Sequence, residues 1–247
     1  MSLLRRRLSD GERLDLDGAV LRLRVNSRAR RISLRFNPLT GETIVTAPTP
    51  GRLADAVAFA GSRRAWIAQR LLARPPVQSL AATTSIQILG AECLLIPDGR
   101  RPRLIGADEG SPARIAGCGI GAVDAQLVVR AVKAEALGVF RRRASAHCLA
   151  LGAPAPSIAL IDARTRWGSC TPAQGGRPAS IRLSWRLALA PYAVADYVVA
   201  HECAHLLEAN HGPRFWAHVR GLVGEHGAHR AWLRDNGAAL HAFAAAA

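Results

Sequence analysis

The N-terminal third of the chain alternates apolar and basic residues with a period of two, the spacing of a strand with one buried face. Residues 19–26 (AVLRLRVN) and 30–37 (RRISLRFN) carry this pattern, and ETIVTAP follows across NPLTG, a Pro/Gly turn. These segments predict a hairpin sheet with a row of arginines on one face. Residues 54–73 then place apolar side chains at helical spacing, which predicts one helix with Trp66 on its buried stripe.

The middle of the chain predicts further short strands. Residues 73–85 are rich in Pro, Ser and Thr without periodicity and indicate a connector. Strands are expected in SIQILG, CLLIP, PRLIG and QLVVR (residues 126–130). The glycine cluster AGCGIGAVD lacks the Lys-Ser/Thr ending and the helix start of a phosphate-binding loop, so we expect a plain turn there.

Helical spacing begins at Lys133 and ends at Gly152. Strands are expected in PSIALIDAR, TRWGSC and SIRLSWRL, followed by a helix from Pro191 to Ala209 and helical segments over 212–223 and 229–243. The pattern predicts an α+β fold. We expect an N-terminal tail (1–18), a β-rich part with one helix (19–132) and a part that contains the histidine-bearing helix (133–247).

Basic residues outnumber acidic ones by 33 to 18, a net charge of +15. Residues 1–75 contain 15 arginines and six acids, so the charge is densest there. Such a potential attracts nucleic acid or nucleotides, although a solvated face that keeps the protein soluble explains it equally well. Five widely spaced cysteines without a CxxC pair, and no long apolar stretch, predict a soluble cytoplasmic protein without membrane spans.

The segment HECAHLLEANH, residues 201–211, concentrates three histidines and two glutamates. Positions four apart share one face of a helix, so His201 and His205 can aim at one point while Glu202 lies beside them. The apolar residues around this H-E-x-x-H arrangement predict a buried helix. A bound metal would offset the cost of burying the imidazoles.

Glu208 and His211 are both candidates for the third ligand. His211 is preferred, because three neutral nitrogens suit Zn²⁺ and Glu208 then remains free to orient a ligand. Cys203 points to roughly the opposite side of the helix and is expected to be a buried thiol. Three protein ligands leave room for water, which is typical of a catalytic zinc site with one ion per chain.

These residue types predict hydrolysis by metal-activated water. Zinc lowers the pKa of its water, and Glu202 would accept the proton and pass it to the leaving group. Asn210, beside the third histidine, is a further candidate for the surroundings of the site. RWGSC contains a glycine that suggests a close backbone approach, and Arg166, Trp167, Ser169 and Cys170 are candidates for the cleft, with plain strand packing as the alternative.

RWGSC, SIRLSWRL and YVVAHECAHLLEANHGPRFW, in this order, resemble the YgjP-like metallopeptidase-domain family, whose zincin fold is related to that of the SprT-like and WLM metalloproteases. ISLRFNPLTGETIVTAP resembles the same family, so the likeness extends from about Val20 to Leu233. It implies a zincin-like domain with His201, His205 and His211 as zinc ligands and Glu202 as the catalytic glutamate. The family's substrates are poorly defined.

Three functions remain open from the sequence. The first is a zinc-dependent peptidase that acts on polypeptide, with RWGSC or SIRLSWRL as the edge along which an extended substrate pairs. The second is a nucleotide pyrophosphohydrolase whose arginines bind phosphates, although no acidic Mg²⁺ cluster is visible. The third is a basic nucleic-acid-binding protein with a structural zinc.

Overall fold

The computed structural model describes residues 8–37, 40–72, 83–99, 101–106, 113–163 and 166–243. The chain forms two compact units, residues 1–77 and 78–247. They are connected by the segment predicted as a linker, of which residues 73–82 lie outside the described residues. The boundary expected between residues 132 and 133 falls inside a helix, because the segment before Lys133 is helical rather than extended.

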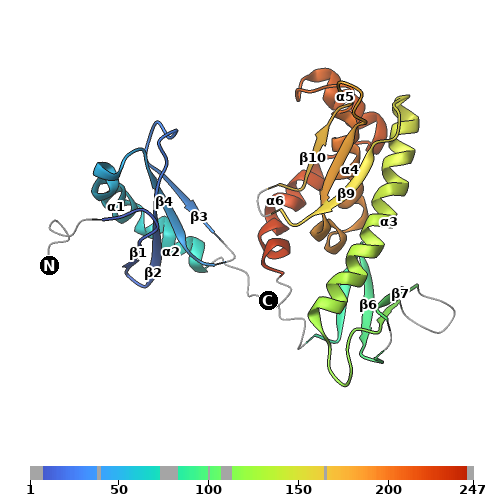
Figure 1. Ribbon diagram of the computed structural model, residues 1–247, viewed down its shortest axis with the longest axis horizontal. Helices are drawn as coiled ribbons and strands as arrows, with labels where there is room; N and C mark the ends of the chain where they lie inside the picture. The colour runs from blue at the N-terminus through green and yellow to red at the C-terminus, as the bar shows by residue number, and fades with distance from the viewer. Residues whose placement is uncertain are drawn as a thin grey trace. The chain divides into compact units, whose positions relative to one another are not determined.

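Unit 1 is a four-stranded sheet covered by helices on one face (Figure 1). Its strands are β1 (Arg13–Leu16), β2 (Ala19–Val25), β3 (Ser33–Phe36) and β4 (Thr43–Ala47), in the order β1-β2-β4-β3. β1 lies within the segment expected to be a tail. A single turn of 3₁₀ helix (Pro50–Arg52) leads into α1 (Leu53–Ser62), which Arg63 separates from α2 (Arg64–Leu72), so the one expected helix is two.

The alternation in β2 and β4 decides which face of this sheet is buried. Leu21, Leu23 and Val45 are at most 1% exposed and pack against Ala56 and Ile67 of the helices. The intervening residues of β2, including its arginines, lie on the other face. The period-two pattern therefore correctly predicted the row of arginines.

Unit 2 is built around α3 (Ala125–Leu151), the longest helix described (Figure 1). Asp124 caps its start by accepting hydrogen bonds from the backbone N–H groups of Gln126 and Leu127 at 2.8 and 3.4 Å. Gly152, with a φ of 65°, ends it in the left-handed conformation. Residues 126–130, predicted as a strand, are part of this helix. Their apolar run fits either element, and the cap at Asp124 decides between them.

Two sheets and three more helices complete unit 2. One sheet has the order β5-β6-β8-β7, from β5 (Ser85–Ile88), β6 (Ala91–Ile96), β7 (Arg103–Ile105) and β8 (Arg114–Ala116), of which β8 was not anticipated. The other has the order β10-β11-β9, from β9 (Ser157–Ile161), β10 (Gly168–Thr171) and β11 (Ser180–Ser184). A 3₁₀ helix (Trp185–Leu189) precedes α4 (Tyr192–Ala204), α5 (Pro213–Val223) and α6 (Gly227–Ala242).

The arrangement is α+β, as predicted. None of the described helices is long and apolar enough to cross a membrane. All five cysteines are free thiols, and four of them are buried.

A partly buried polar cluster ties α3 to α4. Arg143 donates two hydrogen bonds to the Asp196 carboxylate, at 2.7 and 2.9 Å, and His147 Nε2 lies 2.7 Å from the same carboxylate. Burial opposes ionisation of Asp196, but the hydrogen bonds from His147 and Arg143 outweigh it and hold the pKa of this carboxyl below its usual value. The cluster fixes the position of α4 along α3.

We expect Asp196→Asn to lower the free energy of unfolding by about 2 kcal/mol at neutral pH, because it leaves Arg143 without its anion. A carboxyl whose pKa is depressed in the folded state stabilises above its unfolded pKa and loses this effect as the pH falls. The difference between wild type and variant should therefore narrow below about pH 4. Urea unfolding of wild type and variant at several pH values measures this difference in the free energy of unfolding.

The matched control is Asp55→Asn, which removes an exposed carboxylate paired with Arg52. It should leave the unfolding free energy nearly unchanged at every pH. A difference for Asp196→Asn that stays constant down to pH 2 would contradict the assigned role of the carboxylate.

Candidate metal centre

The histidines of the HECAHLLEANH segment lie where α4 ends. His201 and Glu202 belong to its last turn, and His205 is the residue that follows the helix. The helix had been expected to continue to Ala209. Instead the chain turns after Ala204, and His211 comes just before Gly212, which opens α5. This early end allows the chain to return and bring His211 to the other two histidines.

The three imidazoles converge on one point. A nitrogen of each of His201, His205 and His211 lies within 4.8 Å of the corresponding atoms of the other two. The Nε2 atoms of His201 and His211 are 3.1 Å apart. Within the described part of the chain, this is the group of His, Cys, Asp and Glu side chains that could hold a metal ion.

The surroundings lower the pKa values of His201 and His211. Burial, together with the neighbouring His205 and His211, lowers the pKa of His201 to about 3. Burial and His205 also lower the pKa of His211. Nδ1 of His205 lies 3.0 Å from the backbone carbonyl oxygen of Glu208, which can only accept a hydrogen bond. The proton of His205 is therefore on Nδ1, and its Nε2 lone pair is free to bind a metal.

An aromatic wall supports the imidazoles from α5. Phe215 is fully buried, and its ring centroid lies 4.8, 4.5 and 4.6 Å from those of His201, His205 and His211. The adjacent Trp216 ring is 5.9 Å from His201 and 5.7 Å from His211. Neither ring was predicted to lie at the site. Their position directly after the Gly-Pro at the start of α5 is the signal that could have identified them.

A stack of rings lies behind this wall. His226 is 9% exposed and is sandwiched between Tyr197 and Trp216, with centroid distances of 5.6 and 5.1 Å and interplanar angles of 5° in both cases. The stack connects α4 to α5 and to the residue before α6. It fixes the ends of the elements that carry the three histidines.

Glu202 is held against the backbone of β10. Its side chain is 6% exposed, and a Cβ added to Gly168 would lie 2.5 Å from its Oε1 and 2.7 Å from its Cδ. The close approach expected from the glycine of RWGSC is thus present, and Glu202 is the group that approaches. Burial raises the pKa of Glu202 to about 7, an effect that the nearby Arg166 partly offsets.

A cavity of about 430 Å³ opens over these groups. Its walls are Gly168, Ser169, Cys170 and Pro172 on the strand side and His201, Glu202, His205, Ala209 and His211 on the other. The carboxylate and the imidazoles therefore face the same space as the end of β10. Burial, with the charge of Glu202, raises the pKa of Cys170 to about 12, so its thiol is protonated in the absence of a metal.

The other residues that the sequence suggested for the site lie around the histidines and Glu202. The Glu208 carboxylate pairs with Arg214 at 3.0 Å, so its carbonyl rather than its carboxylate contacts the histidine cluster. Asn210 and Arg166 are exposed. Trp167 stacks on His241 of α6 at 4.3 Å and packs into the core.

The thiol of Cys203 points away from the cavity, toward α3. Its sulfur lies 3.8 Å from that of Cys148 and 3.9 Å from the carbonyl oxygen of Ala144. Burial raises its pKa, as expected for an inert thiol in the core. The face of α4 opposite the histidines therefore serves packing.

The family model of the YgjP-like metallopeptidase domain matches residues 30–236. The chain belongs to this family. The match spans both units and includes every residue of the histidine cluster. No curated protein and no solved structure matches the chain. A metallopeptidase domain implies a metal, and the three converging imidazoles are the group suited to hold it.

We expect Gly168→Ala to lower the free energy of unfolding of chelator-treated protein by about 2 kcal/mol, because the new methyl group overlaps Glu202. In a Glu202→Ala background the overlapping atoms are absent, so Gly168→Ala should then lower the free energy of unfolding much less. A double-mutant cycle by urea unfolding measures the coupling.

Gly106→Ala is the control, since nothing lies within 4 Å of the added Cβ. It should change the free energy of unfolding by the same amount with and without the Glu202→Ala substitution. If Gly168→Ala were equally destabilising with and without Glu202, the contact between the strand and the carboxylate would be refuted.

Proposed function

We propose that this protein is a zinc-dependent metallopeptidase in which His201, His205 and His211 hold the metal and Glu202 is the general base. The observation that carries the proposal is the convergence of three imidazoles beside a buried carboxylate at one cavity. Membership of a metallopeptidase family supports the same chemistry.

The donor set fits zinc. Three uncharged imidazole nitrogens are typical ligands of Zn²⁺, whereas Mg²⁺ and Ca²⁺ prefer oxygen. The Glu208 carbonyl orients His205 in the way that outer contacts of zinc ligands commonly do. Among the described residues, the converging ligand atoms are those of the three histidines, without the thiol of Cys170 or the carboxylate of Glu208, which pairs with Arg214. Three protein ligands favour a catalytic over a structural ion.

The chain's own residues would divide the work of hydrolysis. Zinc bound here would polarise the scissile carbonyl group and acidify water. Glu202 lies beside the ligands and would accept a proton from the attacking water and then deliver it to the leaving amine. Gly168 allows the carboxylate to sit at the strand backbone, and Phe215 excludes water from the back of the imidazoles.

β10 is the edge that suits an extended polypeptide. β11 has β10 on one side and β9 on the other, so its backbone groups are already paired. Among the described residues β10 pairs with β11 alone, and its residues Gly168, Ser169 and Cys170 line the cavity. A substrate strand added to this edge would run past Glu202 and the histidines. Of the two strands considered from the sequence, β10 is therefore the proposed substrate edge.

No observation favours the pyrophosphohydrolase or the structural-zinc alternative. Within the described residues, no group of three or more carboxylates that could hold Mg²⁺ accompanies the histidines. The cytoplasmic location remains a prediction from the cysteine pattern.

Elemental analysis of protein purified without a histidine tag should find about one zinc per chain. His211→Ala should lose most of this zinc, because two imidazoles and water bind it far more weakly. Glu208→Ala should keep it, since the alanine retains the backbone carbonyl that contacts His205. Loss of zinc in Glu208→Ala with retention in His211→Ala would replace His211 by Glu208 as the ligand.

Glu202→Gln separates the three functions, because it keeps the shape of the side chain and removes the base. With unfolded casein as the probe, we expect wild-type cleavage to fall at least about a hundredfold in the variant, with zinc content unchanged. Hydrolysis of a nucleoside triphosphate without casein cleavage would establish the pyrophosphohydrolase instead. Turnover unaffected by the substitution would refute Glu202 as the base.

A further inference from the structure

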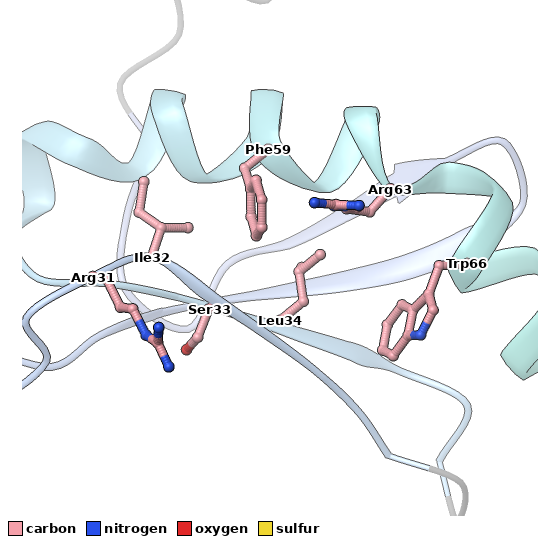
Figure 2. Close-up of a pocket in the computed structure, with 7 residues that line it drawn as sticks. All are labelled: Arg31, Ile32, Ser33, Leu34, Phe59, Arg63 and Trp66. Atoms are coloured by element: carbon pink, nitrogen blue, oxygen red, sulfur yellow. The ribbon is translucent and has the colours of Figure 1, made fainter.

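An apolar groove in unit 1 lies between β3 and the two helices (Figure 2). Its volume is about 510 Å³. Figure 2 shows Ile32 and Leu34 of the β3 segment pointing toward the helix side, where they meet Phe59 of α1 and Trp66 of α2. The groove is thus bounded by two aromatic rings. Arg63 also lines it, with its guanidinium 5.7 Å from the Phe59 ring centroid.

Arg31 and Ser33 point to the other side of the same strand in Figure 2. This is the face of the sheet that the helices leave uncovered. The strand register aligns Arg13 of β1 with Arg22 of β2, and Arg22 and Arg35 both with Ile44 of β4. Arg13, Arg22 and Arg35 therefore lie at one level across the uncovered face, with Ile44 between Arg22 and Arg35, and the last of them belongs to the strand that forms the groove.

All six acidic residues of unit 1 are engaged elsewhere. Asp17, Glu42 and Asp55 form ion pairs with Arg64, Arg13 and Arg52, while Asp10, Glu12 and Asp15 accept hydrogen bonds from nearby backbone N–H groups. Six exposed arginines of the β2–β3 region have no carboxylate partner among the described residues: Arg22, Arg24, Arg28, Arg30, Arg31 and Arg35.

This arrangement opposes folding. Arg22 lies directly opposite Arg13 on the neighbouring strand, and like charges in such positions repel. Among the described residues, none of the six arginines has a carboxylate partner. Surface arginines kept for solubility alone would be interspersed with acids rather than collected on one uncovered sheet face. A polyanionic ligand would remove the repulsion.

We propose that unit 1 binds single-stranded nucleic acid across β3, with phosphates on the arginine face and bases in the groove. These six guanidinium groups, which have no carboxylate partner among the described residues, match the phosphate backbone, which presents charges at regular intervals. Phe59, Trp66 and the Arg63 guanidinium offer planar surfaces on which unpaired bases stack. The phosphates of a duplex can also pair with the arginines, but its bases are paired with one another and cannot enter the groove.

The test uses the full chain and a fluorescently labelled mixed-sequence 20-nucleotide DNA strand, with anisotropy measured at several salt concentrations. Arg22→Gln/Arg35→Gln should weaken binding at least tenfold. It should also reduce the slope of log K against log salt by roughly 1.4, about 0.7 for each phosphate that an arginine no longer neutralises. Circular dichroism melting verifies that the variant is folded.

The control is Arg130→Gln/Arg141→Gln, which removes the same charge from exposed positions of α3 in unit 2. It should retain the wild-type slope. An equal loss of affinity in this control would overturn the assignment of the binding surface to unit 1, because binding would then depend on net charge alone. No binding by the wild type at low salt would overturn the proposal entirely.

The groove is tested separately by Trp66→Leu, which keeps an apolar side chain and removes the stacking surface. We expect about tenfold weaker binding of the strand, with an unchanged salt slope and unchanged binding of an abasic strand of the same length. An intact duplex or an abasic strand that binds the wild type as tightly as the normal strand would refute a role for the bases. Equal affinity for polyglutamate of the same charge would replace nucleic acid by an acidic polypeptide.

Discussion

The metal site depends on the burial of α4. This helix packs against α3, α5, α6 and β10, and nine of its residues are buried. Its back face, with Cys203, is apolar and close-packed, and the Asp196 cluster fixes its position along α3. Such packing leaves no freedom for the last turn to move. The His201 imidazole and the Glu202 carboxylate are therefore held in position before any metal binds.

The same burial sets the properties of the polar groups at the end of α4. Desolvation keeps His201 neutral and raises the pKa of Glu202, while the thiols of Cys170 and Cys203 remain protonated. In the absence of a metal, one physical cause thus leaves the His201 imidazole neutral and both thiols protonated. The ring stack of Tyr197, His226 and Trp216 extends this dry environment behind the site.

The two units differ in where their charge lies. Unit 2 concentrates its chemistry in a small cavity between a helix end and a strand edge. Unit 1 instead presents arginines on an open sheet face, without carboxylate partners among the described residues, and an aromatic groove beside it. A cavity with three donors suits one ion and one scissile bond, whereas an extended basic face suits a long ligand. The proposed peptidase and nucleic-acid activities therefore use different surfaces and can be tested independently.

The sequence by itself determined the family, the α+β class and the side chains that form the histidine cluster, because spacing on a helix and alternation on a strand are local properties. It did not determine where α4 ends: apolar residues continue past His205, and only the turn after Ala204 brings His211 back. Residues 126–130 were misassigned because a short apolar run fits a strand or a buried helix equally. Three other features depend on how distant segments pack against one another. Phe215 lies behind the imidazoles, Gly168 lies against Glu202, and the described acids of unit 1 pair away from the β2–β3 arginines. Tertiary packing decided these features, because a local sequence pattern does not specify which distant side chain will pack against a buried surface.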